Sequence, residues 1–283
     1  MLNKKTVYEI ITEQIINSLE QDRIPWRKPW SDFGSPKNLL TGKEYSGINF
    51  FLLSLSGWQN PYFLTYKQAK KLGGNIKKGE KQSPICWYSP IVKKDKSTGE
   101  EKSFKCLRYY GVFNVEQTEN IPLDKIPDLK KPDNFSPIEQ AENIILGYQK
   151  KPEIVYSNQG AFYSPSQDLV NLPEKNTYDK PESFYATAFH ELTHSTGHKK
   201  RLDREGITNS DGFGNHLYSK EELIAEMGSA FLCSKSGIDN TLENSKSYIQ
   251  NWLRVLRGNS KMVIEASTKA KQASEHILNI MFN

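Results

Sequence analysis

The first pattern along the chain is an amphipathic one. Apolar side chains recur three and four positions apart at Val7, Ile10, Ile11, Ile15, Ile16 and Leu19. This spacing places them on one face of a helix, and the proline at position 25 cannot continue it. We therefore predict a helix over residues 6–19.

The segment that follows, up to about residue 115, is rich in turns and aromatic residues. Short apolar runs at residues 85–88 and 107–115 predict two strands, and the lysine-rich stretch 93–102 predicts an exposed hairpin tip. Prolines then recur every five residues at positions 122, 127, 132 and 137, which extends the backbone. We therefore predict a first domain over residues 1–120, a linker over residues 121–136 and a second domain over residues 137–283.

The second domain begins with a predicted helix over residues 137–148. Three short runs with β propensity follow at residues 153–156, 161–163 and 168–172. The pattern is then helical, and it predicts helices over residues 181–196, 219–235, 244–258 and 260–280. Strands followed by helices indicate an α+β domain, so the predicted fold class is α+β in two domains.

Basic residues concentrate in the first domain. Residues 1–120 contain 19 Lys and Arg against 12 Asp and Glu, whereas the rest of the chain contains 19 against 21. This surplus suits a nucleic acid partner, although it is also common on solvated surfaces. No run approaches the ~20 apolar residues that span a bilayer, so we expect no membrane partner. Cys86, Cys106 and Cys233 form no Cys-x-x-Cys pair, which favours a reducing cytoplasm as the location.

The helix predicted over residues 181–196 carries candidate metal chemistry. His190 and His194 are four positions apart, so their imidazoles project from one face and can reach one tetrahedral ion. Glu191 is offset by one position, from which its carboxylate can act as general base on a water in the open coordination position. The alternative, two buried histidines paired with carboxylates, is costly without a metal. We predict Zn²⁺ as the cofactor and metal-assisted peptide hydrolysis as the chemistry.

A third protein ligand must come from another element. A metzincin has a histidine six positions after the second one, where this chain has Lys200. The helix predicted over residues 219–235 carries Glu222 and Glu226 one turn apart, a pattern that resembles the gluzincin class of metallopeptidases. The resemblance implies Glu222 as the ligand and Glu226 as the support of a ligand histidine. The reverse assignment stays open.

Hydrolysis of this kind also needs a hydrogen-bond donor for the oxyanion. Tyr218 is a candidate catalytic residue for this role, with His216 and Tyr163 as further candidates. Each of them can instead be a packing or surface residue, and the same holds for His198.

Aromatic and cationic residues interleave in the first domain. Proteins hold single strands without reading sequence by stacking bases on aromatic faces while Lys and Arg follow the phosphates. The candidate nucleic-acid-binding residues are Trp26, Arg27, Lys28, Trp30, Lys43, Tyr45, Tyr66, Lys67, Lys70 and Lys71. Any one of these aromatic residues can instead belong to the core.

Several motifs, in the same order along the chain, resemble one family. Residues 11–20, 25–30, 45–49, 65–74, 77–81 and 113–117 are similar to the N-terminal single-stranded-DNA-binding domain of the ArdC-like antirestriction proteins. Residues 190–198, 201–204, 213–214, 218 and 221–232 are similar to the zincin-like metallopeptidase domain of the same family. The resemblance implies a protein of conjugative or other mobile elements that binds single-stranded DNA and shields incoming DNA from host restriction. A host restriction enzyme or another protein is the candidate peptidase substrate.

Two other hypotheses stay open at this point. The first is a protein that only binds single-stranded DNA, in which zinc is structural. The second is a cytoplasmic protease whose basic domain recruits an acidic protein.

Overall fold

The computed structural model describes residues 5–27, 34–94, 101–129, 136–208, 216–239 and 246–280. Helices and strands are mixed throughout these residues, which confirms the α+β fold class. None of the described helices is both long and apolar enough to cross a membrane.

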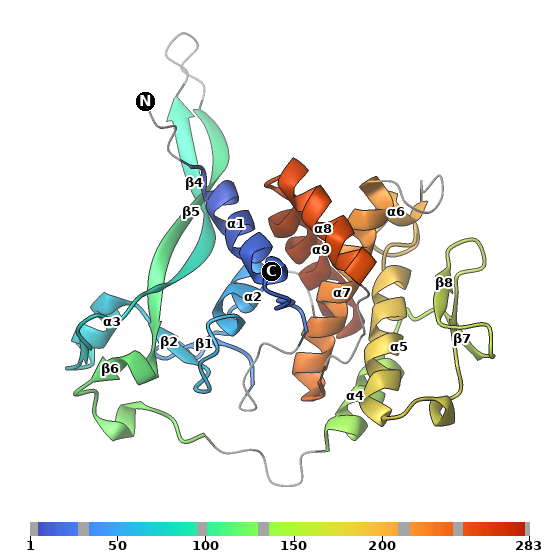
Figure 1. The fold of residues 1–283 in the computed structure, drawn as a ribbon, viewed down its shortest axis with the longest axis horizontal. Coiled ribbons are helices and arrows are strands. Elements are labelled where there is room, and N and C mark those ends of the chain that lie inside the picture. Colours follow the sequence, from blue (N-terminus) through green and yellow to red (C-terminus); the bar gives the residue numbers. More distant parts are fainter. Residues whose placement is uncertain are drawn as a thin grey trace.

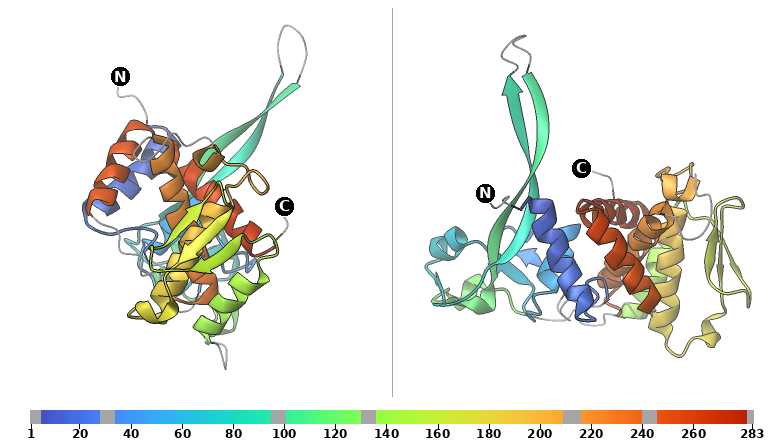
Figure 2. Two further views of the ribbon diagram at one scale, coloured as in Figure 1. Left: turned by 90° about the vertical axis from the view of Figure 1, so that its right-hand side faces the viewer. Right: turned by 45° about the horizontal axis from the view of Figure 1, so that its top comes forward.

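A long antiparallel hairpin dominates the N-terminal half (Figure 1). Strands β4 (Ser83–Lys94) and β5 (Glu101–Asn114) pair continuously. Strand β4 contains the strand predicted over residues 85–88, and β5 contains the one predicted over residues 107–115 except for its last residue. Strands β2 (Tyr62–Leu64) and β1 (Lys37–Asn38) extend this sheet in the order β1-β2-β5-β4. Figure 2 shows that the outer part of the hairpin projects away from the helices. The pairing extends to Lys94 and Glu101, well into the predicted tip, and residues 95–100 lie outside the described residues.

The first helix, α1 (Val7–Glu20), begins where the sequence predicts it. The backbone N–H of Glu9 donates to the Thr6 hydroxyl, and the Thr6 backbone N–H donates to the Glu9 carboxylate, so both orphan donors are satisfied. Two short helices, α2 (Ile48–Ser54) and α3 (Tyr66–Lys71), were not predicted. Short helices of this kind, one of them almost wholly buried, have no clear amphipathic period.

A small sheet and short 3₁₀ turns complete the N-terminal half and the connection. Strands β3 (Asn75–Ile76) and β6 (Thr118–Glu119) pair with each other. Turn η1 (Val115–Gln117) follows β5, and η2 (Leu123–Lys125) lies in the segment predicted as a linker.

The C-terminal half packs a bundle of helices beside a three-stranded sheet (Figure 1). The helices are α4 (Pro137–Gly147), α5 (Pro181–Ser195), α6 (Glu205–Thr208), α7 (His216–Ser236), α8 (Lys246–Gly258) and α9 (Met262–Ile277). The strands are β7 (Glu153–Tyr156), β8 (Phe162–Ser164) and β9 (Leu169–Leu172), and turn η3 (Lys175–Thr177) precedes α5. The sheet order is β7-β9-β8, with β7 parallel and β8 antiparallel to β9.

The two halves share one hydrophobic core. The ring of Trp26 meets that of Trp252 edge-on, with centroids 5.1 Å apart. Phe50 and Phe51 of α2 pack against Phe231 of α7, with ring centroids 5.2 and 5.0 Å from it. Helices α1 and α2 therefore lie against the C-terminal bundle and are continuous with its core.

Helices α5 and α7 approach each other closely, and this contact positions the candidate site. Gly228 of α7 faces Thr193 of α5, where a Cβ atom at position 228 would lie 2.5 Å from the Thr193 Cγ2 atom. The Ser229 hydroxyl donates to the Ala186 carbonyl across the same contact, at 2.8 Å. A side chain larger than hydrogen at position 228 would push the two helices apart.

Candidate metal centre

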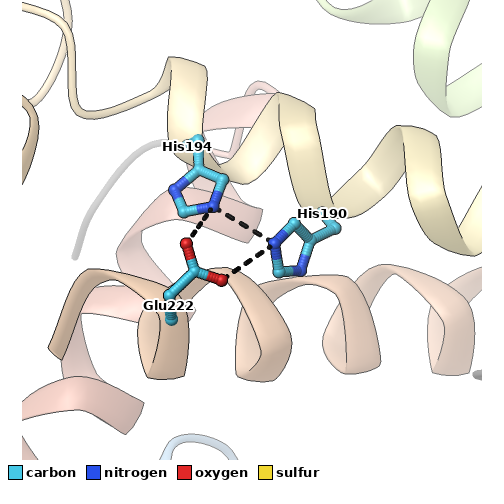
Figure 3. A group of neighbouring side chains, drawn as sticks. All are labelled: His190, His194 and Glu222. Carbon is cyan, nitrogen blue, oxygen red and sulfur yellow. Dashed lines mark hydrogen bonds and ion pairs between the residues drawn. The ribbon is translucent and has the colours of Figure 1, made fainter. Parts of the chain in front are cut away.

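Helix α5 presents His190 and His194 on one face. It begins at Pro181, whose fixed φ suits the first turn of a helix, with Glu182 close to the positive end of the helix dipole. Phe184, Ala188, Phe189 and Leu192 are fully or almost fully buried, so the core holds the opposite side of the helix. The imidazoles of His190 and His194 then project together toward α7, as Figure 3 shows.

Glu222 of α7 meets both imidazoles. Its Oε2 atom lies 3.6 Å from His190 Nε2, and its Oε1 atom lies 3.4 Å from His194 Nε2 (Figure 3). The two Nε2 atoms are 3.1 Å apart. Among the described residues these three form a group whose candidate ligand atoms all lie within 4.8 Å of one another. Glu222 is therefore the carboxylate that the fold brings to the histidine pair.

The donor set fits a zinc ion. Two imidazole nitrogens and a carboxylate oxygen leave the fourth tetrahedral position open, as in catalytic zinc sites. All three side chains are mostly buried, between 11 and 12% exposed. Two imidazole nitrogens at hydrogen-bond distance must share a proton when no cation lies between them. A divalent cation satisfies both nitrogens and the carboxylate together.

The electrostatics of the cluster depend on these carboxylates. Burial lowers the pKa of the His194 imidazole, but the charge of Glu222 and the proximity of Glu221 outweigh it and raise that pKa to about 10. The pKa of His190 is also raised, since the interaction with Glu222 outweighs burial. Burial raises the pKa of the Glu222 carboxyl, yet the two histidines bring it well below its usual range. In the absence of a cation the cluster therefore retains protons that a metal must displace.

A buried ion pair supports His194 from behind, and the sequence did not predict it. Glu221 Oε1 lies 3.5 Å from His194 Nδ1, on the ring edge opposite the candidate ligand atom. Arg204 donates through Nε to Glu221 Oε2 at 3.0 Å and through Nη2 to Oε1 at 2.5 Å. Both side chains are 4% exposed. The sequence had a hint in the residues 201–204 motif, but nothing in it showed which carboxylate the arginine meets.

Arg204 also holds the end of α5. Its Nη2 atom donates to the Thr193 carbonyl at 2.8 Å, and its Nη1 atom donates to the Thr196 hydroxyl at 2.6 Å. A cation at the C-terminus of a helix also interacts favourably with the helix dipole. Arg204 thus connects the last turn of α5, which carries His194, to α7.

The sequence predicted that Glu226 supports a ligand histidine. At His194, Glu221 has this supporting role. Glu226 is buried one turn beyond Glu222 on α7, outside the group of three candidate ligands. Positions 221 and 226 lie on opposite flanks of Glu222, and the crossing of α5 over α7 places His194 on the flank of Glu221. Glu226 instead contributes to the raised pKa of the His190 imidazole. The prediction that Glu226 supports a ligand histidine therefore stays a prediction, with His190 as the histidine concerned.

Glu191 is the candidate general base. It follows His190 on α5 and is 8% exposed. Its carboxylate makes no hydrogen bond or ion pair within the part of the chain that the structure describes, so its oxygen atoms are available to a proton donor.

The structure describes the side chain of only one of the three candidate oxyanion donors, Tyr163. Tyr218 and His216 belong to the first turn of α7, and their side chains lie outside the described part of the structure. The Tyr163 hydroxyl donates to Asp168 Oδ1 at 2.9 Å and accepts from Arg201 Nη2 at 3.2 Å. Because both hydrogen bonds are internal, Tyr163 stabilises the loop rather than serving as a free donor.

His198 belongs to the same loop network. Its Nδ1 atom accepts the Lys200 backbone N–H at 3.2 Å and lies 3.8 Å from Asp168 Oδ2. Arg201 binds Asp168 and also donates to the Ser195 carbonyl at 2.7 Å, so this network anchors the segment after α5. His198 is outside the group of candidate metal ligands.

The candidate nucleic-acid-binding residues fall into three groups. Trp26 is fully buried against Trp252, so the prediction that it stacks on bases was wrong. Lys28 and Trp30 lie outside the described residues. Tyr45 is partly buried, packs edge-on against Phe63 and accepts a hydrogen bond from Asn38. The remaining candidates are exposed, namely Arg27, Lys43, Tyr66, Lys67, Lys70 and Lys71.

The fold and the arrangement of the candidate ligands identify the C-terminal half as a zincin-like metallopeptidase domain. Residues 139–269 match the family model for this kind of domain. Residues 5–113 match the model for the N-terminal domain of anti-restriction factor ArdC. The chain belongs to the ArdC family of antirestriction proteins, which confirms the resemblance seen in the sequence.

Solved structures agree with this assignment over nearly the whole chain. The metal-free crystal structure of the antirestriction ArdC protein from plasmid R388 is 34% identical, with a TM-score of 0.80. The match covers 98% of this chain and 100% of that one. The Mn(II)-bound structure of the same protein gives 32% identity and a TM-score of 0.80, with 98% of each chain covered.

Curated relatives are longer or uncharacterised. Two Escherichia coli proteins, both named DNA primase TraC, are 33% and 31% identical over 97% of this chain. The match covers 27% and 20% of their lengths, so the chain spans about a quarter or less of these relatives. The uncharacterized protein y4eC of Sinorhizobium fredii is 29% identical over 95% of this chain and 90% of its own length.

Proposed function

We propose that this protein is a mobile-element antirestriction factor that binds single-stranded DNA and holds zinc in a peptidase-type hydrolytic site. The observation that carries the hydrolytic part is the convergence of His190, His194 and Glu222 in one buried cluster. Its location would be the cytoplasm, where incoming DNA meets restriction enzymes, and a host protein is the candidate substrate.

The residues of the site divide the chemistry between them. The two imidazoles and the Glu222 carboxylate would hold a zinc ion, which would supply Lewis acidity to a water and to a peptide carbonyl. Glu191 would accept a proton from the attacking water at a carboxylate oxygen and return it to the departing amine. Arg204 and Glu221 hold the His194 ring in place, since a ligand histidine that is fixed through its second nitrogen keeps its orientation.

The DNA-binding part rests on charge and exposure in the N-terminal half. Residues 1–120 carry a surplus of seven basic residues, whereas the rest of the chain is slightly acidic. Helix α3 presents an exposed Tyr66 with Lys70 Nζ 5.7 Å from the centre of its ring. Aromatic faces beside cations suit unpaired bases and phosphates. Two relatives are named DNA primase, and a third is an antirestriction protein from plasmid R388. These names favour a DNA partner for this chain.

The Glu191→Gln variant tests the hydrolytic proposal. It removes the proton acceptor and keeps the size of the side chain, so metal content and DNA binding should remain at the level of the unchanged protein. Cleavage of an unstructured fluorescent casein by the zinc-loaded protein should fall at least a hundredfold, since general base catalysis contributes about 10²–10⁴. The His190→Ala variant, which loses the metal as well, is the comparison.

Two results would contradict the proposal. Equal cleavage by the unchanged protein and Glu191→Gln would exclude Glu191 as the base. Full protection of transferred DNA from restriction by Glu191→Gln, with zinc still bound, would favour the alternative in which zinc is structural and protection comes from occupying the DNA.

A further inference from the structure

The β4–β5 hairpin concentrates exposed aromatic side chains. Trp87 and Tyr88 of β4 and Tyr109 and Tyr110 of β5 are each between 41 and 48% exposed. The other large exposed apolar residues of the described chain are scattered over different elements. Scattered exposure needs no explanation, but a cluster on one element indicates a binding surface.

The strand register sorts these four residues onto two faces. Trp87 lies directly opposite Arg108. Tyr110 lies directly opposite Ile85, two positions along the strands toward the base of the hairpin. Residues directly opposite each other in an antiparallel pair point to the same face, and two positions along a strand correspond to about 7 Å. Trp87, Arg108 and Tyr110 therefore share one face, which we call the hairpin face. Tyr88 and Tyr109 point to the opposite face.

The protein itself uses the opposite face. Cys86 and Leu107 on that side are buried in the core shared with α1 and α2. The Tyr88 hydroxyl lies 3.4 Å from the Tyr8 hydroxyl of α1. Figure 1 shows α1 lying alongside the hairpin. Tyr88 thus has a partner on α1, whereas no described residue hydrogen-bonds to or stacks on Trp87 of the hairpin face.

The hairpin face stands on a rigid base. Ile85 and Val112, which continue the face toward the sheet, are buried in a small cluster with Leu53 and Phe63. Tyr45 and Trp58 pack against the same cluster. Rigid aromatic side chains lose little conformational entropy when a ligand stacks on them.

Charge on the hairpin face selects an anionic partner. From the pair Ser83–Val112 to the pair Ser89–Cys106, the face carries no carboxylate. The Arg108 guanidinium makes no hydrogen bond or ion pair with any described residue, so its five donors are available. Lys77, Lys78 and Lys81, just before β4, are exposed and add positive charge at the base of the hairpin.

We propose that the hairpin face, with Trp87 and Tyr110 as stacking platforms and Arg108 as a phosphate contact, binds unpaired bases of single-stranded DNA. This inference rests on the proposed DNA-binding function and assigns it to a specific surface, one that the interleaved residues 26–71 do not include. Base stacking is tolerant of sequence, because every base has an aromatic face.

Binding of a fluorescein-labelled oligo(dT) strand, followed by anisotropy, tests this assignment. Trp87→Ala and Tyr110→Ala should each weaken binding by about fivefold to a hundredfold, and Trp87→Phe should restore most of the affinity. Arg108→Ala should reduce the slope of log K against log salt by about 0.7. Tyr109→Ala is the matched control, because Tyr109 is a similarly exposed tyrosine on the opposite face of the same strand. This variant should bind as the unchanged protein does.

The outcomes separate the surface from the function. If the unchanged protein binds oligo(dT) and the Trp87→Ala and Tyr110→Ala variants bind as well as Tyr109→Ala does, the hairpin face is not the site, although the function stands. If the unchanged protein binds no oligo(dT) at low salt, the proposed DNA-binding function itself fails. A variant that changes the oligomeric state in size-exclusion chromatography, with oligo(dT) affinity intact, would show that the face contacts a second copy of the chain instead.

Discussion

The contact between Gly228 and Thr193 makes the metal centre sensitive to a single methyl group. In Gly228→Ala the new Cβ atom would lie 2.5 Å from Thr193 Cγ2 and 2.7 Å from its Oγ1. Ordinary van der Waals contact begins at 3.4 Å, so the Cγ2 atom must retreat by about 0.9 Å. Thr193 is fully buried and donates to the Phe189 carbonyl at 2.7 Å, which restrains its side chain. Most of the displacement must therefore come from separation of α5 and α7.

The expected cost follows from two opposing effects. Overpacking a well-packed contact costs about 1–3 kcal/mol. Alanine gains about 1 kcal/mol over glycine in a helix, so the net loss of stability should be roughly 0–2 kcal/mol. Metal affinity should fall more clearly, by about tenfold or more, because metal–ligand distances tolerate only about ±0.2 Å. His194 neighbours Thr193, and Glu222 lies on the helix that moves.

Thermal unfolding and zinc titration against a competing chelator measure the two effects. Gly258→Ala is the control, because a Cβ atom at that helical position meets nothing within 4 Å. Adding Thr193→Ala to Gly228→Ala removes the two nearest atoms and leaves the Thr193 Cβ as the nearest one, at 3.2 Å. The double variant should recover most of the affinity, which a double-mutant cycle quantifies. A Gly228→Ala protein with unchanged stability and unchanged zinc affinity would refute the close-contact reasoning.

Three further predictions concern the charges around the site. Arg204→Met should destabilise the protein by about 3–5 kcal/mol in chemical denaturation, because it leaves Glu221 buried without its cation, and a loss below about 1 kcal/mol would contradict this. Burial raises the pKa of the Asp168 carboxyl, but the interaction with Arg201 lowers this pKa by more than burial raises it. The folded pKa therefore lies below the unfolded one, and the stability that the ionised Asp168 contributes is lost as pH falls through the folded pKa. An Asp168→Asn protein should therefore be less stable at neutral pH and show a flatter loss of stability below about pH 4; parallel acid limbs would contradict this. Because the pKa of His194 is raised to about 10, zinc binding at pH 7 to 8 should release protons. The calorimetric heat of binding should then vary with the ionisation enthalpy of the buffer, and a heat that is the same in all buffers would contradict this protonation.

The ligand helix was predictable because its signals are local. The proline at the first turn, the apolar positions that face the core and the two histidines one turn apart all lie within residues 181–195. The amphipathic pattern of residues 6–19 likewise gave α1 almost to the residue. Helices α2 and α3 were missed because six or seven residues give too little periodicity to separate a helix from a strand or a turn.

The rest depends on contacts between distant parts of the chain. Trp26 looks like an exposed stacking residue beside its cationic neighbours, and only the position of Trp252 makes it a core residue. Glu222 and Glu226 share a helix face by their spacing, which says nothing of Glu221. The crossing of α5 over α7 and the position of Arg204 decide that Glu221 meets His194.

The central claim, that one zinc ion binds between α5 and α7, is tested most directly by calorimetric titration of the metal-free protein with zinc. A matched pair of variants on one helix, Glu222→Gln and Glu226→Gln, provides the discrimination. One zinc per chain is expected for the unchanged protein, with loss of at least a hundredfold in affinity for Glu222→Gln and little change for Glu226→Gln. Equal affinity of the unchanged protein and Glu222→Gln, or loss of zinc only in Glu226→Gln, would contradict the account.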